Sequence, residues 1–213
     1  MGCLGLLLLI LITLPIFFAL IFFNIVTLSF SKLGLSAEAA FILLFAMLLG
    51  GTINIPISRQ RIAYRSVRPY YLHFFFYAPP AVTHQVITVN VGGAVIPVCF
   101  ALYLLPLAPL VSTIVATAVV TIVAKWLARP VAGMGITMPF WIPPLFSAGL
   151  VLLLSRGNPA PVAYISGVLG ALIGADLLNW RNFKKLGAQV ISIGGAGVFD
   201  GIFLTGIVAA LIA

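Results

Sequence analysis

The residues of this chain that could do chemistry are its few acids. Only three Asp and Glu residues occur among 213, while 63% of the residues are hydrophobic and 7% are charged. Two of the three, Asp176 and Asp200, lie inside apolar segments. A carboxylate in hydrocarbon costs about 2.5–3.5 kcal/mol on insertion scales, so an intramembrane acid is a functional hypothesis by default. Asp176 and Asp200 are therefore the candidate catalytic residues.

The two aspartates are 24 residues apart, which suits two successive helices that form a hairpin. Two carboxylates that face each other cannot both ionise cheaply, so the pair would share one proton. One carboxylate can then activate a water molecule while the other protonates a leaving group. The spacing thus favours acid/base chemistry on the last two apolar segments.

Glycines accompany both acids. Gly167, Gly170 and Gly174 recur on the segment of Asp176 and predict a seam where another backbone comes close. Gly197 and Gly201 flank Asp200, and glycine weakens a helix by about 1 kcal/mol relative to alanine. An unwound stretch before Asp200 is therefore expected, with Gly197 and Gly201 in the site.

Each acid also has a purely structural interpretation. Asp176 could pair at the membrane interface with Arg181 or Lys184, and Asp200 could form a buried ion pair with Lys125. Such pairs would stabilise the fold without any chemistry.

Asn54 and Asn90 are further polar residues at membrane depth, each beside a helix-weakening Gly or Pro. They could line a cavity beside the aspartates or bind an ion, although such amides more often form hydrogen bonds between helices. His73 and His84 would face each other across a turn at residues 78–79, but no third ligand accompanies them. No metal and no cofactor are expected.

The elements that must position these residues are predicted to be membrane helices. A mean hydropathy of +1.27 is typical of polytopic membrane proteins. The chain is expected to be all-α, a single transmembrane domain over residues 1–213. Apolar windows of about 17–25 residues, the length that spans a bilayer, predict seven spans near residues 4–30, 37–57, 86–105, 110–128, 138–155, 159–180 and 189–212.

Basic residues predict the orientation. With the N-terminus in the cytoplasm, the inner loops hold nine of the eleven Lys and Arg residues, against Lys32 and Arg156 outside. The net charge of +8 then marks cytoplasmic loops, and no nucleic-acid partner is expected. Residues 58–85 form the sizeable polar connection, where 70–77 and 82–89 predict a β-like hairpin at the interface. Membrane lipids are the expected surroundings of this cell-membrane protein.

The C-terminal segments resemble the catalytic hairpin of intramembrane aspartyl proteases of the presenilin and signal peptide peptidase type. Those enzymes place one aspartate near the inner end of a span and a second in a Gly-x-Gly-Asp motif on the next. Here Ala175 replaces the tyrosine before the first acid, and Phe199 replaces the glycine before the second. The whole chain also resembles an uncharacterised family of prokaryotic integral membrane proteins, which implies no activity.

Two functions follow from these patterns. The first is an intramembrane aspartyl protease, in which Asp176 and Asp200 hydrolyse a membrane-embedded peptide. The second is an ion-coupled transporter or channel, because glycine-broken helices with aspartates and amides also describe such carriers. Acids separated by about one water favour the enzyme, whereas acids each ringed by carbonyl and amide oxygens favour ion binding.

Overall fold

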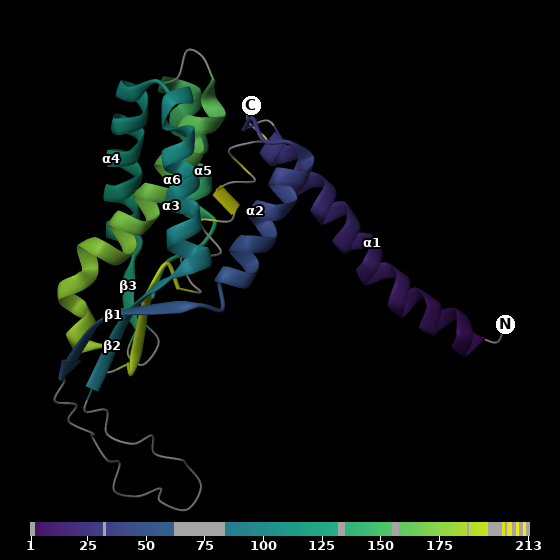
Figure 1. Cartoon of the computed structure of the whole chain (residues 1–213), viewed down its shortest axis with the longest axis horizontal. Coiled ribbons are helices and arrows are strands. Elements are labelled where there is room, and N and C mark those ends of the chain that lie inside the picture. The colour runs from purple at the N-terminus through teal and green to yellow at the C-terminus, as the bar shows by residue number, and fades with distance from the viewer. Residues whose placement is uncertain are drawn as a thin grey trace, which may run out of the picture.

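Helix α6, Pro159–Ala171, lies at the centre of a helical bundle, and eleven of its 13 residues are buried. It packs against α3, Ile96–Leu104, α4, Leu110–Leu127, and α5, Ile142–Leu154 (Figure 1). The computed structural model describes residues 3–31, 33–61, 84–131, 135–154, 158–186 and 188–195, with single positions at 202, 204, 205, 208 and 211.

The N-terminal helices lie to one side of this bundle. α1, Cys3–Ser31, packs on α2, Ala37–Gly50, near its C-terminal end and extends away from the other helices (Figure 1). Ser36 caps α2 by accepting a hydrogen bond from the Ala39 N–H at 3.2 Å, and Glu38 lies in the first turn. Both features stabilise a helix N-terminus, so the third acid of the chain has a structural explanation.

Prolines begin or precede the other helices, as expected from the missing N–H and fixed φ of proline. Pro109 is the N-cap of α4, Pro159 begins α6, and Pro143 and Pro144 occupy the first turn of α5. Two π-helical turns interrupt the pattern. They are η1, Val91–Val95, before α3, and η3, Leu172–Asp176, after α6. A 3₁₀-helix, η4, Leu177–Lys185, continues from η3, and a short one, η2, Leu105–Leu107, follows α3.

A three-stranded sheet with the order β1-β2-β5 lies at one end of the bundle (Figure 1). β1, Asn54–Arg61, and β2, His84–Asn90, are antiparallel, and β5, Val190–Ile193, is parallel to β2. Short strands β3, Arg129–Val131, and β4, Gly135–Thr137, pair with each other. β2 and β5 are rich in β-branched residues, which favours strand over helix.

The sheet corrects three predicted spans. The span expected over 37–57 ends as helix at Gly50, the span over 86–105 begins as strand β2, and the span over 189–212 begins as strand β5. Apolar windows do not separate these cases, because a buried strand and a helix carry the same hydrophobic run. The chain is mostly helical but not all-α.

The predicted β-like hairpin also differs from the structure. Residues 62–83, which contain its first arm, lie outside the described residues, as do Arg65, Arg68 and His73. The second arm overlaps β2, but β2 pairs with β1 on one edge and β5 on the other. His84 is opposite Arg61 in this register.

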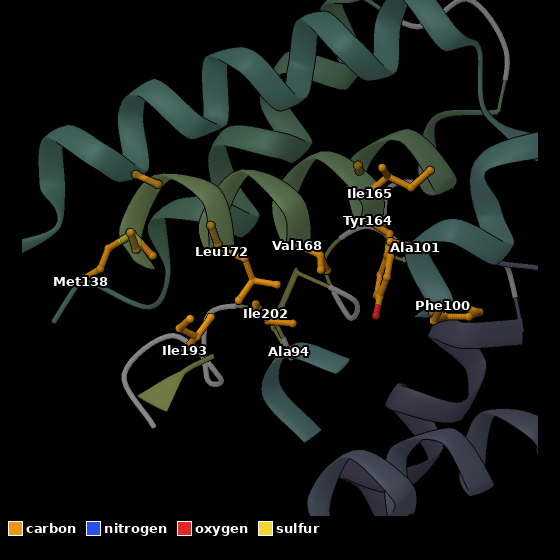
Figure 2. Close-up of a cluster of buried hydrophobic side chains, with 14 of the residues drawn as sticks. Ala94, Phe100, Ala101, Met138, Tyr164, Ile165, Val168, Leu172, Ile193 and Ile202 are labelled. Carbon is orange, nitrogen blue, oxygen red and sulfur yellow. The ribbon is translucent and has the colours of Figure 1, made fainter. Parts of the chain in front are cut away.

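The core consists of aromatic and aliphatic side chains around α6. Tyr164 lies edge-on to Phe100, with ring centroids 4.9 Å apart, and also contacts Phe30. Figure 2 shows Tyr164, Val168 and Leu172 facing residues from the segments near α3 and β5. Ile202, near the C-terminus, belongs to the same buried cluster.

Large apolar side chains cover much of the outer surface. On α1 the exposed residues include Leu11, Phe17 and Phe18, and on α4 Val111 is 76% exposed. Two helices, Leu110–Leu127 and Pro159–Phe183, are long and apolar enough to cross a membrane. The second is mostly buried inside the protein.

Basic residues gather at the sheet end of the bundle. Arg59 lies in β1, Lys125 in the last turn of α4, Arg129 begins β3, and Arg181 lies in η4. α4 and α6 both run toward this end, whereas their N-terminal ends lie at the opposite side (Figure 1). The predicted inner group of basic residues therefore shares one end of the molecule as far as it is described.

Candidate functional site

Asp176 is the last residue of the π-turn η3 and is 2% exposed. Its Oδ2 accepts a hydrogen bond from the backbone N–H of Gly194 at 2.7 Å. Within the described part of the chain, no basic side chain forms an ion pair with this carboxylate. Arg181 is exposed, and the side chain of Lys184 lies outside the described residues. Among the described residues, the carboxylate is thus held in place by one neutral donor.

Gly194 reaches Asp176 because β5 returns the chain to the bundle. It directly follows β5 and has a φ of +68°, a conformation that residues with a Cβ rarely adopt. A Cβ on Gly194 would also lie 2.7 Å from the carbonyl of Gly93. Two separate requirements, the left-handed φ and the close backbone approach, therefore demand glycine beside the acid.

Asn90 organises the next layer of the site. Its Oδ1 accepts the Gly93 N–H at 2.6 Å and so caps η1, while its Nδ2 donates to Gly51 O at 2.7 Å. Nδ2 also donates to Asn54 Oδ1 at 3.2 Å, and the Ser192 hydroxyl donates to the same oxygen. The network joins the end of α2 to strands β1, β2 and β5.

A second polar group supports the helix break at Asp176. The Lys125 ammonium donates to Leu178 O at 2.7 Å and to Asn179 Oδ1 at 2.6 Å. Asn179 Nδ2 in turn donates to Ala175 O at 2.8 Å. Where η3 changes to η4, backbone carbonyls lose their helical partners. Lys125 and Asn179 supply donors there.

These contacts place Asp176, Asn90 and Asn54 in one connected region, through Gly194 and Gly93. The other predicted site residues, Asp200, Gly197 and Gly201, lie outside the described residues. The predicted pairing of Lys125 with Asp200 is therefore untested, but the ammonium of Lys125 already has two acceptors. The asparagines join a helix end to strands, and no direct bond links them to Asp176.

The glycine seam on α6 serves two neighbours. Gly170 and Gly174 contact α4. A Cβ on Gly170 would meet the Val120 side chain at 2.6 Å, and one on Gly174 would lie closer still to Thr121 O. Gly167 instead contacts the side chains of Thr205 and Ser147. At these glycines the structure shows the predicted close approach of neighbouring segments. Other elements cover α6 on several sides, and this places it at the centre of the bundle.

Sequence reasoning missed Asn179 and Ser192. Asn179 follows Asp176 by three residues and was readable as a polar residue at the end of an apolar span. Ser192 gave no signal, because its role depends on β5 lying beside β2. Among the described residues, no group of three His, Cys, Asp or Glu side chains is arranged to hold a metal ion.

A family model described as "Protein of unknown function (DUF1614)" matches residues 48–212. The chain belongs to this family. No curated protein and no solved structure matches the chain. The DUF1614 match agrees with the predicted resemblance to an uncharacterised family, and it gives no support to the protease resemblance. The matched residues include Asn54, Asn90 and Asp176, together with the glycines that accompany Asp176 and Asp200 in the sequence.

Proposed function

We propose that this DUF1614 protein is an intramembrane aspartyl peptidase in which Asp176 and Asp200 form the catalytic pair. The observation that carries the proposal is the buried carboxylate of Asp176, which Gly194 holds with one backbone N–H and which no described cation neutralises. Gly194 lies six residues before Asp200 in the sequence. A buried acid without a structural ion pair is available for proton transfer.

The described residues on either side of Asp200 support its approach to Asp176. Gly194 contacts Asp176 directly, and Ile202 is buried in the cluster that includes Leu172, one helical turn before Asp176. Gly194 and Ile202, which precede and follow Asp200 in the sequence, thus both lie in the region of Asp176.

In the proposed reaction the two carboxylates share one proton. The ionised acid takes a proton from water, whose oxygen attacks the peptide carbonyl carbon. The protonated acid then gives its proton to the leaving amide nitrogen as the C–N bond breaks. The products are a carboxylic acid and an amine. The pair has gained one proton from water and given one away, so it again holds a single proton, now on the other carboxylate.

The membrane location rests on the apolar outer surface. α1, α4 and α5 expose large aliphatic and aromatic side chains that no other described element covers, and such contiguous surface marks contact with lipid or protein. We place the basic sheet end in the cytoplasm, because loops rich in Lys and Arg remain inside. In this orientation the chain passes the membrane several times and Asp176 lies in its inner half.

An ion-coupled carrier is the second candidate. Its specific support is the pair of π-turns, both next to buried polar side chains: η1 begins the helix that continues as α3, and η3 interrupts the helix between α6 and η4. Broken helices with free backbone groups at membrane depth are typical of ion sites in carriers. Where the surroundings of Asp176 are described, however, its hydrogen-bond partner is an N–H donor and not a ring of oxygens.

Cleavage by the purified protein in lipid nanodiscs distinguishes the two candidates. The substrate is a set of transmembrane peptides with a fluorophore and quencher on either side of the helix. Asp176→Asn and Asp200→Asn should each lower the cleavage rate by at least about 100-fold, the usual contribution of acid/base catalysis. Glu38→Gln is the matched control, because Glu38 is the exposed third acid and should leave the rate unchanged.

Cleavage that survives Asp200→Asn would overturn the peptidase proposal. If no peptide is cleaved, proteoliposomes are loaded with a pH-sensitive dye and given a sodium or proton gradient. Ion flux that both aspartates control would then establish the carrier.

A further inference from the structure

A groove of about 490 Å³ runs between α4 and the α6–η3 helix on the outside of the bundle. Its volume lies in the range of ligand-binding pockets, about 300–1,000 Å³. The α4 wall includes Thr113, Thr117 and Thr121, which recur every fourth residue. The opposite wall includes Ile165, Leu169 and Ile173 at the same interval. Side chains four residues apart share a helix face, so each wall is one continuous stripe.

The surface of the groove is almost entirely carbon. The Thr113 hydroxyl donates a hydrogen bond to Pro109 O at 2.8 Å, in the first turn of the same helix. A groove that offers no polar groups along its length suits an aliphatic chain. From Leu110 to Ile122 the α4 wall rises about 18 Å at 1.5 Å per residue. One leaflet of a bilayer core is about 15 Å thick, half of the whole hydrocarbon layer.

One end of the groove is positively charged. The α4 stripe continues from Thr121 to Lys125, one turn further, at the basic sheet end of the molecule. An ammonium has three N–H donors, and Lys125 uses two of them on Leu178 O and Asn179 Oδ1. Arg129 and Arg181 are exposed on neighbouring segments. The third donor of Lys125, at this basic end of the molecule, suits an anionic phosphate.

We infer that this groove is a binding site for one anionic phospholipid, with an acyl chain between the two stripes and the headgroup at Lys125. The charge at one end and the carbon lining along the rest match the two parts of such a lipid. Basic pockets between membrane helices on the cytoplasmic side bind anionic headgroups. The inference depends on membrane insertion and not on the peptidase chemistry.

Native mass spectrometry tests this site with the intact protein. The protein is exchanged into detergent that contains equal amounts of phosphatidylglycerol and phosphatidylcholine with identical acyl chains. The wild type should retain one lipid, with phosphatidylglycerol preferred about tenfold. Ala118→Trp fills the groove from an exposed position and should lower retention of both lipids about tenfold. Val115→Trp, an exposed α4 residue outside the groove, is the matched control and should change nothing.

Lys125→Gln separates the contribution of the lipid headgroup to binding from that of the acyl chain. The glutamine amide can still donate to Leu178 O, but its charge is gone, so retention should persist without preference for phosphatidylglycerol. If Ala118→Trp fails to fold, Ile114→Trp, another exposed lining residue, gives the same test. Equal retention in the groove variants and Val115→Trp would overturn the inference, as would a wild type without headgroup preference. A groove filled by a second copy would also overturn it, and Ala118→Trp would then convert dimer to monomer without a change in lipid.

Discussion

Asn90 and Asp176 are both buried polar residues at a π-turn, yet they are bonded in contrasting ways. Asn90 caps η1 and makes three hydrogen bonds, to Gly93, Gly51 and Asn54, which hold a helix end against two strands. Asp176 ends η3 and accepts one hydrogen bond from Gly194. The helix break beside Asp176 is instead supported by Lys125 and Asn179.

The difference separates a structural polar residue from one available for chemistry. Every side-chain group of Asn90 is engaged with the protein, so its loss should cost stability. The helix break beside Asp176 is supported by Lys125 and Asn179, so we expect its carboxylate to contribute little to the stability of the fold. Five substitutions examine the roles of these buried groups, from the largest expected effect on stability to the smallest.

Gly92→Ala should be the most destabilising change on the Asn90 side. An added Cβ would overlap Met47 O and Gly51 N, both backbone atoms that cannot move independently. Overpacking of this kind costs about 3 kcal/mol, and thermal melting in detergent measures it. Gly149→Ala in α5 is the matched control, because nothing lies within 4 Å of its Cβ position. It should gain up to about 1 kcal/mol from helix propensity. Equal melting temperatures for both variants would contradict the close contact of α2 with η1.

Asn90→Ala should lower stability by about 2 kcal/mol, because it leaves the Gly93 N–H and Gly51 O without their partner. For a chain of this size the corresponding fall in melting temperature is about 6 °C. Asn54→Ala should cost less, since Asn54 is exposed and accepts only from Asn90 and Ser192. If Asn54→Ala proved the more harmful of the two, the central role of Asn90 in this network would be wrong.

Tyr164→Phe should change stability little or raise it by about 1 kcal/mol. The hydroxyl is buried in the core and has no hydrogen-bond partner among the described residues. An unsatisfied buried hydroxyl is costly, and phenylalanine keeps the ring contacts with Phe100 and Phe30. The melting temperature of this variant is the measurement. A clear fall would reveal a partner for the hydroxyl in the C-terminal segment.

The sequence predicted the helical elements best where an apolar run was bounded by proline or a capping residue. The span expected over 110–128 is α4, Leu110–Leu127, with Pro109 before it and Arg129-Pro130 after it. The spans predicted over 86–105 and 189–212 are wrong at their beginnings, where the chain forms strands. In a buried pair of parallel strands, Val, Ile and Thr give the same apolar run as part of a membrane helix.

The site was predicted in its residues but not in its contacts. Rarity of acids in an apolar chain pointed to Asp176, and adjacent glycines pointed to Asn90. The partners of Asp176 depend on β5 packing beside β2, a long-range pairing without any local signal. The hydrogen bond from Lys125 to Leu178 O in η4 was not predicted, and the pairing of Lys125 with Asp200 stays a prediction. The contact with Leu178 O depends on where the helix breaks.

Thermal melting of Asp176→Asn tests the central contrast most directly. The new Oδ1 can still accept the Gly194 N–H, and a costly buried charge is removed. The account predicts a melting temperature equal to the wild type within about 3 °C, or higher, together with the loss of peptide cleavage. A fall as large as that of Asn90→Ala would contradict it, because the carboxylate would then be a structural group and not one held ready for chemistry.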